Sequence, residues 1–125
     1  MRKLILTLLA ALMLLSAFQA EACAAGVADP SINGTGPDCD LYPGNEAWLF
    51  VDAVACGEQD TLHYIWYGAD TASMSSMIAD IYAPDSSSYH APERSGTRYY
   101  CCGVYAERDG MQSDIVYSRI MSVTY

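Results

Sequence analysis

The sequence is poor in basic residues, and this scarcity excludes two classes of partner. Its 125 residues include 6 Lys and Arg against 15 Asp and Glu, for a formal net charge of −9. Beyond Lys3 there is no lysine at all. Nucleic-acid backbones and anionic lipid surfaces are recognised mainly through Lys and Arg, so we expect neither nucleic acid nor a membrane surface to be the partner.

Groups that could act as a catalytic base are also scarce. Only His63 and His90 carry an imidazole, and neither lies in a known motif. The sequence has no G-x-S-x-G, no H-E-x-x-H, no glycine-rich phosphate loop and no D-x-[DN]-x-[DN]-G calcium loop. His63 alternates with Leu62 and Tyr64, which predicts a surface histidine on a strand. We therefore expect no enzymatic activity, no catalytic residue, no metal site and no cofactor.

Only one long apolar run is present, and it lies at the N-terminus. Arg2 and Lys3 precede the run Leu4–Phe18, and Ala20-Glu21-Ala22 offers a small-x-small cleavage site behind it. A bilayer core needs roughly 20 apolar residues, whereas the apolar region of a secretory signal needs about 7 to 15. The sequence predicts a cleavable signal peptide at 1–22, no membrane span, and a secreted or extracellular protein, with the periplasm or cell surface as alternatives.

Removal of this signal leaves about a hundred residues, the usual size of a single domain. Arg2, Lys3 and Glu21 leave with it, so the net charge becomes about −10. So many acidic side chains are explained by solubility outside the cell, and attraction of a cationic partner is the sharper alternative.

Five cysteines in a short exported chain indicate structural disulfides rather than a metal site. The count is odd, so cleavage beyond Cys23 or its lipidation would leave four, whereas a retained Cys23 would be free or would pair between molecules. Three pairings of the remaining four are open. Adjacent cysteines at 101 and 102 do not form the C-x-x-C spacing of zinc sites. The disulfide candidates are Cys39, Cys56, Cys101 and Cys102.

Short β-rich segments alternate with turn signals along the rest of the chain. Residues 23–37 are predicted as a flexible leader, with a first edge segment as the alternative. Strands are expected at 46–56, 61–67, 77–82, 86–90, 97–105 and 115–125, with one helical turn within 71–77 as a variant. Asp109-Gly110 predicts a hairpin turn. This spacing is typical of an all-β sandwich or barrel.

The segment 46–56 could bury either of its two faces. One face carries Ala47, Leu49 and Val51, and the other carries Trp48, Phe50, Asp52 and Val54. Burying the second face would place the Asp52 carboxylate inside without a visible partner, which is costly. We therefore expect the outward side chains to be Trp48, Phe50 and Val54, and the inverted register is the alternative.

Several segments between 38 and 125 together resemble the immunoglobulin-like domains of bacterial secreted and surface proteins. Leu62-x-Tyr64-x-Trp66-Tyr67 is similar to the third strand of that family with its core tryptophan. Ser95-Gly96-Thr97-Arg98-Tyr99-Tyr100-Cys101-Cys102 is similar to the sixth strand, where a tyrosine stands two residues before a cysteine. Here that spacing occurs twice, from Tyr99 and from Tyr100.

This resemblance implies an antiparallel immunoglobulin-like β-sandwich at 38–125, with Trp66, Tyr99 and Tyr100 as its signature residues. The chain departs from the family at the second strand, where the intersheet disulfide needs an inward cysteine near Ala53. Cys56 lies further on and on the other face, so its bridge to residue 101 or 102 would require a bulge or a shifted register.

The expected function is a non-catalytic binding or adhesion module for a protein or a carbohydrate on a cell surface. Two surfaces are candidates for partner binding: the outward row Trp48, Phe50 and Val54, and the hairpin tip with Arg108 and Asp109. The alternatives are a structural subunit or homo-oligomer, joined through Cys23 or an edge strand, and a secreted inhibitor.

Overall fold

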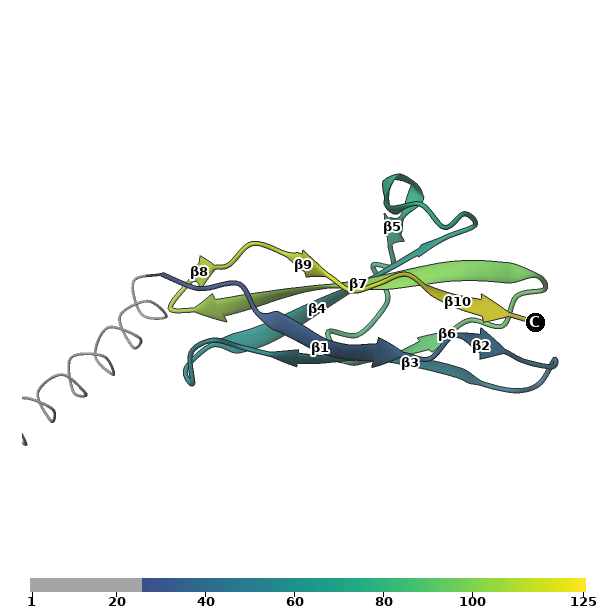
Figure 1. Cartoon of the computed structure of the whole chain (residues 1–125), viewed down its shortest axis with the longest axis horizontal. Helices are drawn as coiled ribbons and strands as arrows, with labels where there is room; N and C mark the ends of the chain where they lie inside the picture. The colour runs from purple at the N-terminus through teal and green to yellow at the C-terminus, as the bar shows by residue number, and fades with distance from the viewer. Residues whose placement is uncertain (1–25) are drawn as a thin grey trace, which may run out of the picture.

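The computed structural model describes residues 26–125, and they form two facing β-sheets (Figure 1). The predicted signal peptide and Cys23 lie outside the described residues. In chain order the elements are β1 (Ser31–Gly36), β2 (Cys39–Asp40), β3 (Ala47–Val54), β4 (Thr61–Ala69), the 3₁₀ turn η1 (Met74–Ser76), β5 (Ile78–Ala79), β6 (Ser88–Ala91), β7 (Thr97–Arg108), β8 (Met111–Gln112), β9 (Val116–Tyr117) and β10 (Met121–Thr124).

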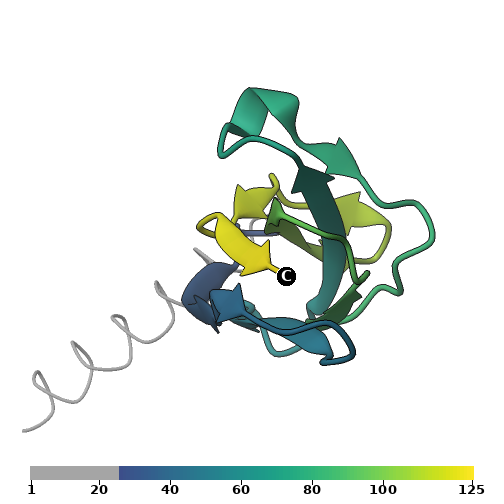
Figure 2. The same cartoon turned by 90° about the vertical axis from the view of Figure 1, so that its right-hand side faces the viewer.

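The smaller sheet has the order β1-β3-β6, and the larger has the order β2-β10-β7-β4-β5, with β8 and β9 also paired to β7. Figure 2 shows the two layers from the end of the sandwich. Neighbouring strands are antiparallel except β2 and β10, which run parallel. The prediction of an all-β sandwich is confirmed, with one parallel pair at its edge.

The alternation of side chains along β3 confirms the predicted register. Ala47, Leu49 and Val51 are buried, while Trp48 and Phe50 are exposed. Asp52 lies in water on the outer face, as the cost of burying a lone carboxylate requires. The smaller sheet thus has one apolar inner face and one mixed outer face.

Stacked aromatic rings occupy the centre of the core. Trp66 is 1% exposed, and its ring stacks on Tyr89 with centroids 5.2 Å apart. Its indole Nε1 donates a hydrogen bond to the Ser86 carbonyl at 2.8 Å, so the buried polar atom has a partner. Tyr89 packs in turn against Tyr100, with centroids at 5.6 Å. These rings join β4, β6 and β7, that is, both sheets.

The two predicted tyrosine–cysteine pairs point to opposite faces of β7. Tyr100 and Cys102 belong to the core between the sheets, whereas Tyr99 is only partly buried. Cys101 is buried but lies outside that core cluster. The sequence left open which of the two pairs faces inward. In the structure, Tyr100 and Cys102 face the core.

The predicted last strand, 115–125, is interrupted by a serine bulge. Ser118 donates its N–H to the Cys102 carbonyl at 2.8 Å, and its Oγ accepts the Cys102 N–H at 2.9 Å. That Oγ also donates to the carbonyl of the next residue, Arg119, at 2.9 Å. Ser113 makes the same three contacts with Ala106 and Asp114. Each serine hydroxyl replaces a backbone partner, so the strand opposite β7 breaks into β8, β9 and β10.

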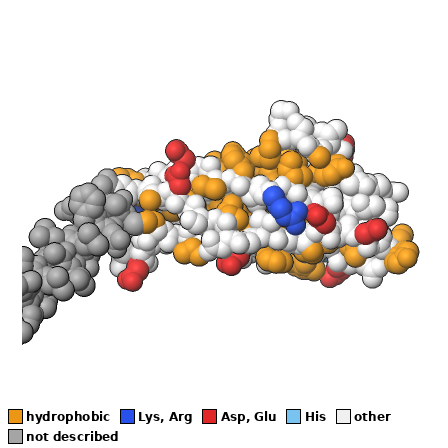
Figure 3. Space-filling model, in the orientation of Figure 1, with side chains coloured by type: hydrophobic (Ala, Val, Ile, Leu, Met, Phe, Trp, Pro, Cys, Tyr) orange, Lys and Arg blue, Asp and Glu red, His pale blue; other side chains and the backbone are white. Residues whose placement is uncertain are grey.

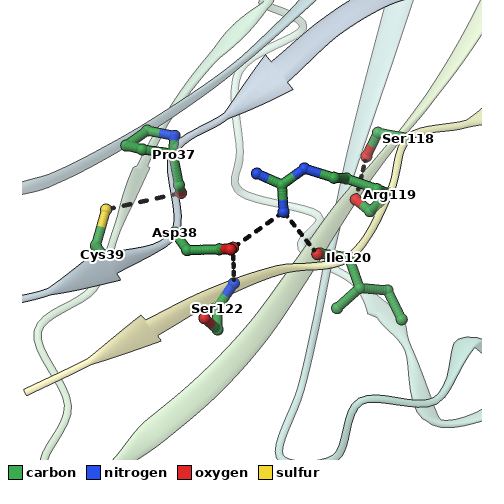
Figure 4. A network of polar contacts seen from close by, with 7 residues as sticks. All are labelled: Pro37, Asp38, Cys39, Ser118, Arg119, Ile120 and Ser122. Carbon is green, nitrogen blue, oxygen red and sulfur yellow. Dashed lines mark hydrogen bonds and ion pairs between the residues drawn. The ribbon is translucent and has the colours of Figure 1, made fainter.

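An ion pair fixes the chain next to Ser118 (Figure 4). The Arg119 guanidinium Nη1 lies 3.0 Å from Asp38 Oδ1, and the same oxygen accepts the Ser122 N–H at 3.0 Å. These two bonds lower the pKa of the Asp38 carboxyl, the Ser122 bond most. The network ties the segment before β2 to β10, where the parallel pair begins.

Two segment predictions need correction. Residues 31–36 form β1, hydrogen-bonded to β3, so the edge segment rather than the flexible leader describes them. Within the predicted strand 77–82 only Ile78–Ala79 is extended against β4, because Asp80 accepts the Tyr82 N–H and turns the chain. The helical turn expected within 71–77 is η1.

Candidate binding surface

The outer face of β3 carries two large aromatic side chains two residues apart. Trp48 is 54% exposed and Phe50 is 47% exposed. Successive side chains on one face of a strand stand about 7 Å apart, so the two rings lie side by side on the sheet. Val54, 51% exposed, continues the row beyond Asp52. We call Trp48, Phe50 and the cross-strand His90 the aromatic face.

Contacts with neighbouring strands hold the rings of the aromatic face in place. His90 of β6 is the cross-strand partner of Trp48, and their rings stack with centroids 4.8 Å apart and an interplanar angle of 17°. Trp48 Nε1 donates to Glu46 Oε2 at 3.2 Å. The stacked rings and this hydrogen bond fix the orientations of the Trp48 and His90 side chains before a partner binds, which lowers the entropy cost of binding.

A glycine keeps the other side of the aromatic face low. Gly36 of β1 pairs with Phe50, and a Cβ on Gly36 would lie 3.6 Å from the Phe50 ring. Without that side chain the ring rests directly over backbone. Further along, Gly34 pairs with Asp52. The glycines of β1 thus leave Phe50 and Asp52 without a cross-strand side chain on that side.

At the hairpin tip, the second predicted binding surface, Arg108 has a structural role. Asp109 and Gly110 have φ angles of 52° and 79°, which confirms the predicted hairpin turn between β7 and β8. Arg108 points inward, where its Nη1 lies 3.3 Å from Asp60 Oδ1 and its Nη2 donates to the Gly26 carbonyl at 3.0 Å. The Asp60 carboxylate is fully buried. Removing Arg108 would leave a buried charge, so this side chain supports the fold.

The disulfide prediction is wrong for three of its four cysteines. Cys39, Cys101 and Cys102 are free thiols. Residues 101 and 102 are consecutive on a strand and face opposite sides. Cys39 pairs with Val123 of β10, and Val123 pairs with Arg98 of β7. Cys39 is therefore displaced from Cys102 by four residues, or about 13 Å, along the strand direction, which is too far for a disulfide.

Cys56 is not one of those free thiols, and no disulfide joins two cysteines within 26–125. Burial raises the pKa of Cys101 to about 11 and that of Cys102 to about 12. Packing around Trp66, rather than an intersheet disulfide, therefore holds the two sheets together in this part of the chain.

The imidazole of His63 is held between two carboxylates. Its Nδ1 lies 2.6 Å from Asp85 Oδ2, and its Nε2 lies 3.0 Å from Glu107 Oε2. Its ring also stacks on Tyr105, its cross-strand partner, with centroids 5.0 Å apart. Each ring nitrogen therefore has a carboxylate partner, and the contacts hold the ring against β7. Asp85 further accepts the Tyr64 N–H at 2.7 Å, which ties the loop before β6 to β4.

Two surfaces escaped the sequence analysis. One is apolar: Figure 3 shows apolar side chains gathered at the base of the protruding segment that contains η1. Ile78, Ile81 and Tyr82, in and after β5, are also exposed. The other is a cavity that contains Arg94 and Arg98. Its residues are up to 32 positions apart along the chain, from Gly68 to Tyr100, so no local pattern could have revealed it.

Comparison with known proteins assigns no family to the chain. No protein-family model matches it, and no curated protein matches its sequence. None of the helical segments in the described part of the chain is long and apolar enough to cross a membrane.

Proposed function

We propose that this protein is an exported, non-catalytic binding module of immunoglobulin-like type that recognises a protein or a carbohydrate on a cell surface. The observation that carries the proposal is the aromatic face. Trp48 and Phe50 are each about half exposed, and two large rings left in water on one face of a sheet favour an interface.

The composition of the aromatic face suits both classes of partner. Tryptophan is enriched among residues whose truncation costs an interface about 2 kcal/mol or more, because it brings large area with few rotatable bonds. The polar groups beside it, Glu46 and His90, supply hydrogen-bond partners around an apolar centre. An apolar centre with a polar rim is the usual anatomy of a recognition surface.

The N-terminal signal supports the location. A chain that leaves the cell and carries a net charge near −10 meets its partners in the periplasm, at the cell surface or in the medium. The resemblance of 38–125 to bacterial immunoglobulin-like domains supports a scaffold whose sheet faces and loops bind, since such domains carry function on their surfaces.

Binding of the purified chain to an array of neutral and acidic glycans and to intact cells tests the proposal. Trp48→Ala should lower the signal at least about tenfold, in line with the loss of an interface anchor. Tyr82→Ala is the matched control, because Tyr82 is an exposed aromatic residue away from β3 and its removal should leave binding unchanged. Equal signals from Trp48→Ala and the unsubstituted chain on every surface would overturn the aromatic face as the binding site.

A second candidate is self-assembly, favoured by β1, a six-residue strand whose outer edge pairs with no other strand of the described residues 26–125. Such an edge can add a strand from a second copy. Analytical ultracentrifugation over a hundredfold concentration range discriminates: a monomer throughout would exclude self-assembly, and dimers abolished by a proline in β1 would favour it over a separate partner.

A further inference from the structure

A cavity of about 250 Å³ lies between the two sheets beside β6, on the side opposite to β1. Strands of both sheets and the turn before β7 line it. Two arginines, Arg94 and Arg98, reach this one cavity. The whole sequence has only 6 Lys and Arg residues, so two arginines at one cavity indicate a candidate site for a negatively charged ligand.

Arg98 is held in position from several sides. Its Nη1 lies 2.8 Å from Asp70 Oδ1, and its guanidinium carbon lies 5.9 Å from the centroid of the Tyr100 ring. A Cβ on Gly68 would come within 3.2 to 3.3 Å of both the guanidinium and that ring, so the glycine makes room for them. The Asp70 carboxylate is exposed, whereas the Arg98 side chain is 24% exposed.

Arg94 differs from the other arginines of the described chain. Arg98, Arg108 and Arg119 each form an ion pair with an aspartate, but no acidic side chain pairs with Arg94 within 26–125. Its neighbour Glu93 is directed elsewhere and accepts the Gly44 N–H at 3.1 Å. Arg94 therefore brings to the cavity a positive charge that no ion pair within 26–125 holds.

The charge of Arg94 acts at the cavity wall. Burial raises the pKa of the Tyr100 phenol, and the positive charges of Arg98 and Arg94 oppose that increase. Arg94, Arg98 and the Tyr100 ring all line this cavity. A negatively charged group in the cavity would be attracted by both guanidinium groups.

The cavity also contains a carboxylate, that of Asp80. Asp80 accepts the Tyr89 hydroxyl on Oδ2 at 2.8 Å and the Tyr82 N–H on Oδ1 at 3.0 Å. Each carboxylate oxygen can accept a further hydrogen bond, and hydroxyl groups are suitable donors. Asp80 would repel a simple anion, so the cavity favours a ligand with a carboxylate at one end and hydroxyls at the other.

We propose that this cavity binds a single acidic sugar, a hydroxylated ring with one carboxylate, whose carboxylate lies between Arg94 and Arg98 and whose hydroxyls donate to Asp80. The volume is below the about 300–1,000 Å³ of pockets for drug-sized ligands, which fits one ring rather than an oligosaccharide. The guanidinium groups of the two arginines suit a carboxylate, which arginine recognises through planar, charge-assisted bonds. The cavity shares no residue with the aromatic face, so the two proposals are tested independently.

Calorimetric titration of the purified chain with glucuronate tests the inference, with glucuronamide and glucose as uncharged comparisons. We expect glucuronate to bind at least about tenfold more tightly than either, because only it carries the carboxylate. Arg94→Gln should remove most of that preference. Arg119→Gln is the matched control, since it removes the same charge from an arginine outside the cavity and should leave glucuronate binding unchanged.

Each other outcome overturns the inference. Equal binding of glucuronate and glucuronamide would show that the carboxylate is not recognised, and equal losses in the two arginine variants would show only a general effect of net charge. No heat of binding and no ligand saturation transfer at about 20 mM glucuronate would show that the cavity takes no acidic sugar. Tighter, Arg94-dependent binding of N-acetyl-glutamate amide would assign the cavity to a protein side chain instead. Far-UV circular dichroism confirms that each variant is folded.

Discussion

The two tryptophans should respond oppositely to truncation, and the contrast tests the register on which the aromatic face depends. Trp66 is 1% exposed, stacks on Tyr89 and donates to a buried carbonyl. Trp48 is 54% exposed, and its main contacts are with His90 and Glu46 at the surface. Trp66→Ala and Trp48→Ala therefore remove the same atoms from very different surroundings.

The expected magnitudes follow from these surroundings. Truncating a buried Trp to Ala costs about 3–5 kcal/mol through lost burial and the cavity left behind. The Ser86 carbonyl that loses its indole donor also becomes unsatisfied, which places Trp66→Ala at the upper end of that range. For Trp48→Ala about half the side-chain surface is already in water, and we expect a loss of about 1 kcal/mol or less. A domain of this size is stable by about 5–15 kcal/mol, so Trp66→Ala should bring it near unfolding.

Urea denaturation followed by far-UV circular dichroism measures both losses without relying on the fluorescence of the residues removed. Trp66→Phe is the intermediate control, because it keeps an aromatic ring in the core but loses the bond to Ser86, and should fall between the two alanine variants. If Trp48→Ala lost as much stability as Trp66→Ala, Trp48 would be a core residue. The register of β3 and the proposed binding surface would then both be refuted.

Three further predictions concern β7 and its neighbours. Gly103→Ala should cost about 1–3 kcal/mol in urea denaturation, because its Cβ would lie 2.9 to 3.3 Å from three side chains, whereas Gly34→Ala, with its nearest contact at 3.7 Å, should cost less; equal losses would contradict this. Because the pKa of the Asp38 carboxyl is lowered from 3.8, its ionised form stabilises the fold above that pH, and this contribution is lost as the pH falls through the lower pKa of the folded state. Asp38→Asn should therefore flatten the dependence of stability on pH in that acid range and cost under about 1 kcal/mol at pH 7. An unchanged pH dependence would argue against the ion pair. The buried thiols Cys101 and Cys102 should resist iodoacetamide at pH 8 in the folded protein and react after unfolding, as mass spectrometry would show, and rapid labelling of the native chain would disprove their burial.

The strands with clear alternation could be predicted from the sequence, because one face of each must avoid water. In β3 a single residue, Asp52, decided the register, since no partner for a buried carboxylate was visible. The hairpin turn at Asp109-Gly110 was equally local, because these residues tolerate positive φ angles. The exposure of Trp48 and Phe50 followed from the register alone.

Predictions failed where distant residues compete for the same groups. The two serine hydroxyls at 113 and 118 break the last strand only because β7 places free backbone groups opposite them. Arg108 had the sequence context of an exposed hairpin tip, yet it turns inward to the buried Asp60. The cysteines satisfied the composition of a disulfide-rich protein, but strand direction and register keep Cys39, Cys101 and Cys102 apart.

The sequence by itself determined the all-β class, the outward position of the aromatic residues and the acidic character of the surface, because these depend on local alternation and composition. Only the tertiary structure decided which tyrosine–cysteine pair faces the core and that Arg94 and Arg98 share one cavity with Asp80. The physical reason is that those arrangements depend on how β4, β5, β6 and β7 pair across long stretches of chain. Pairing across such distances fixes which side chains meet, and no local pattern records it.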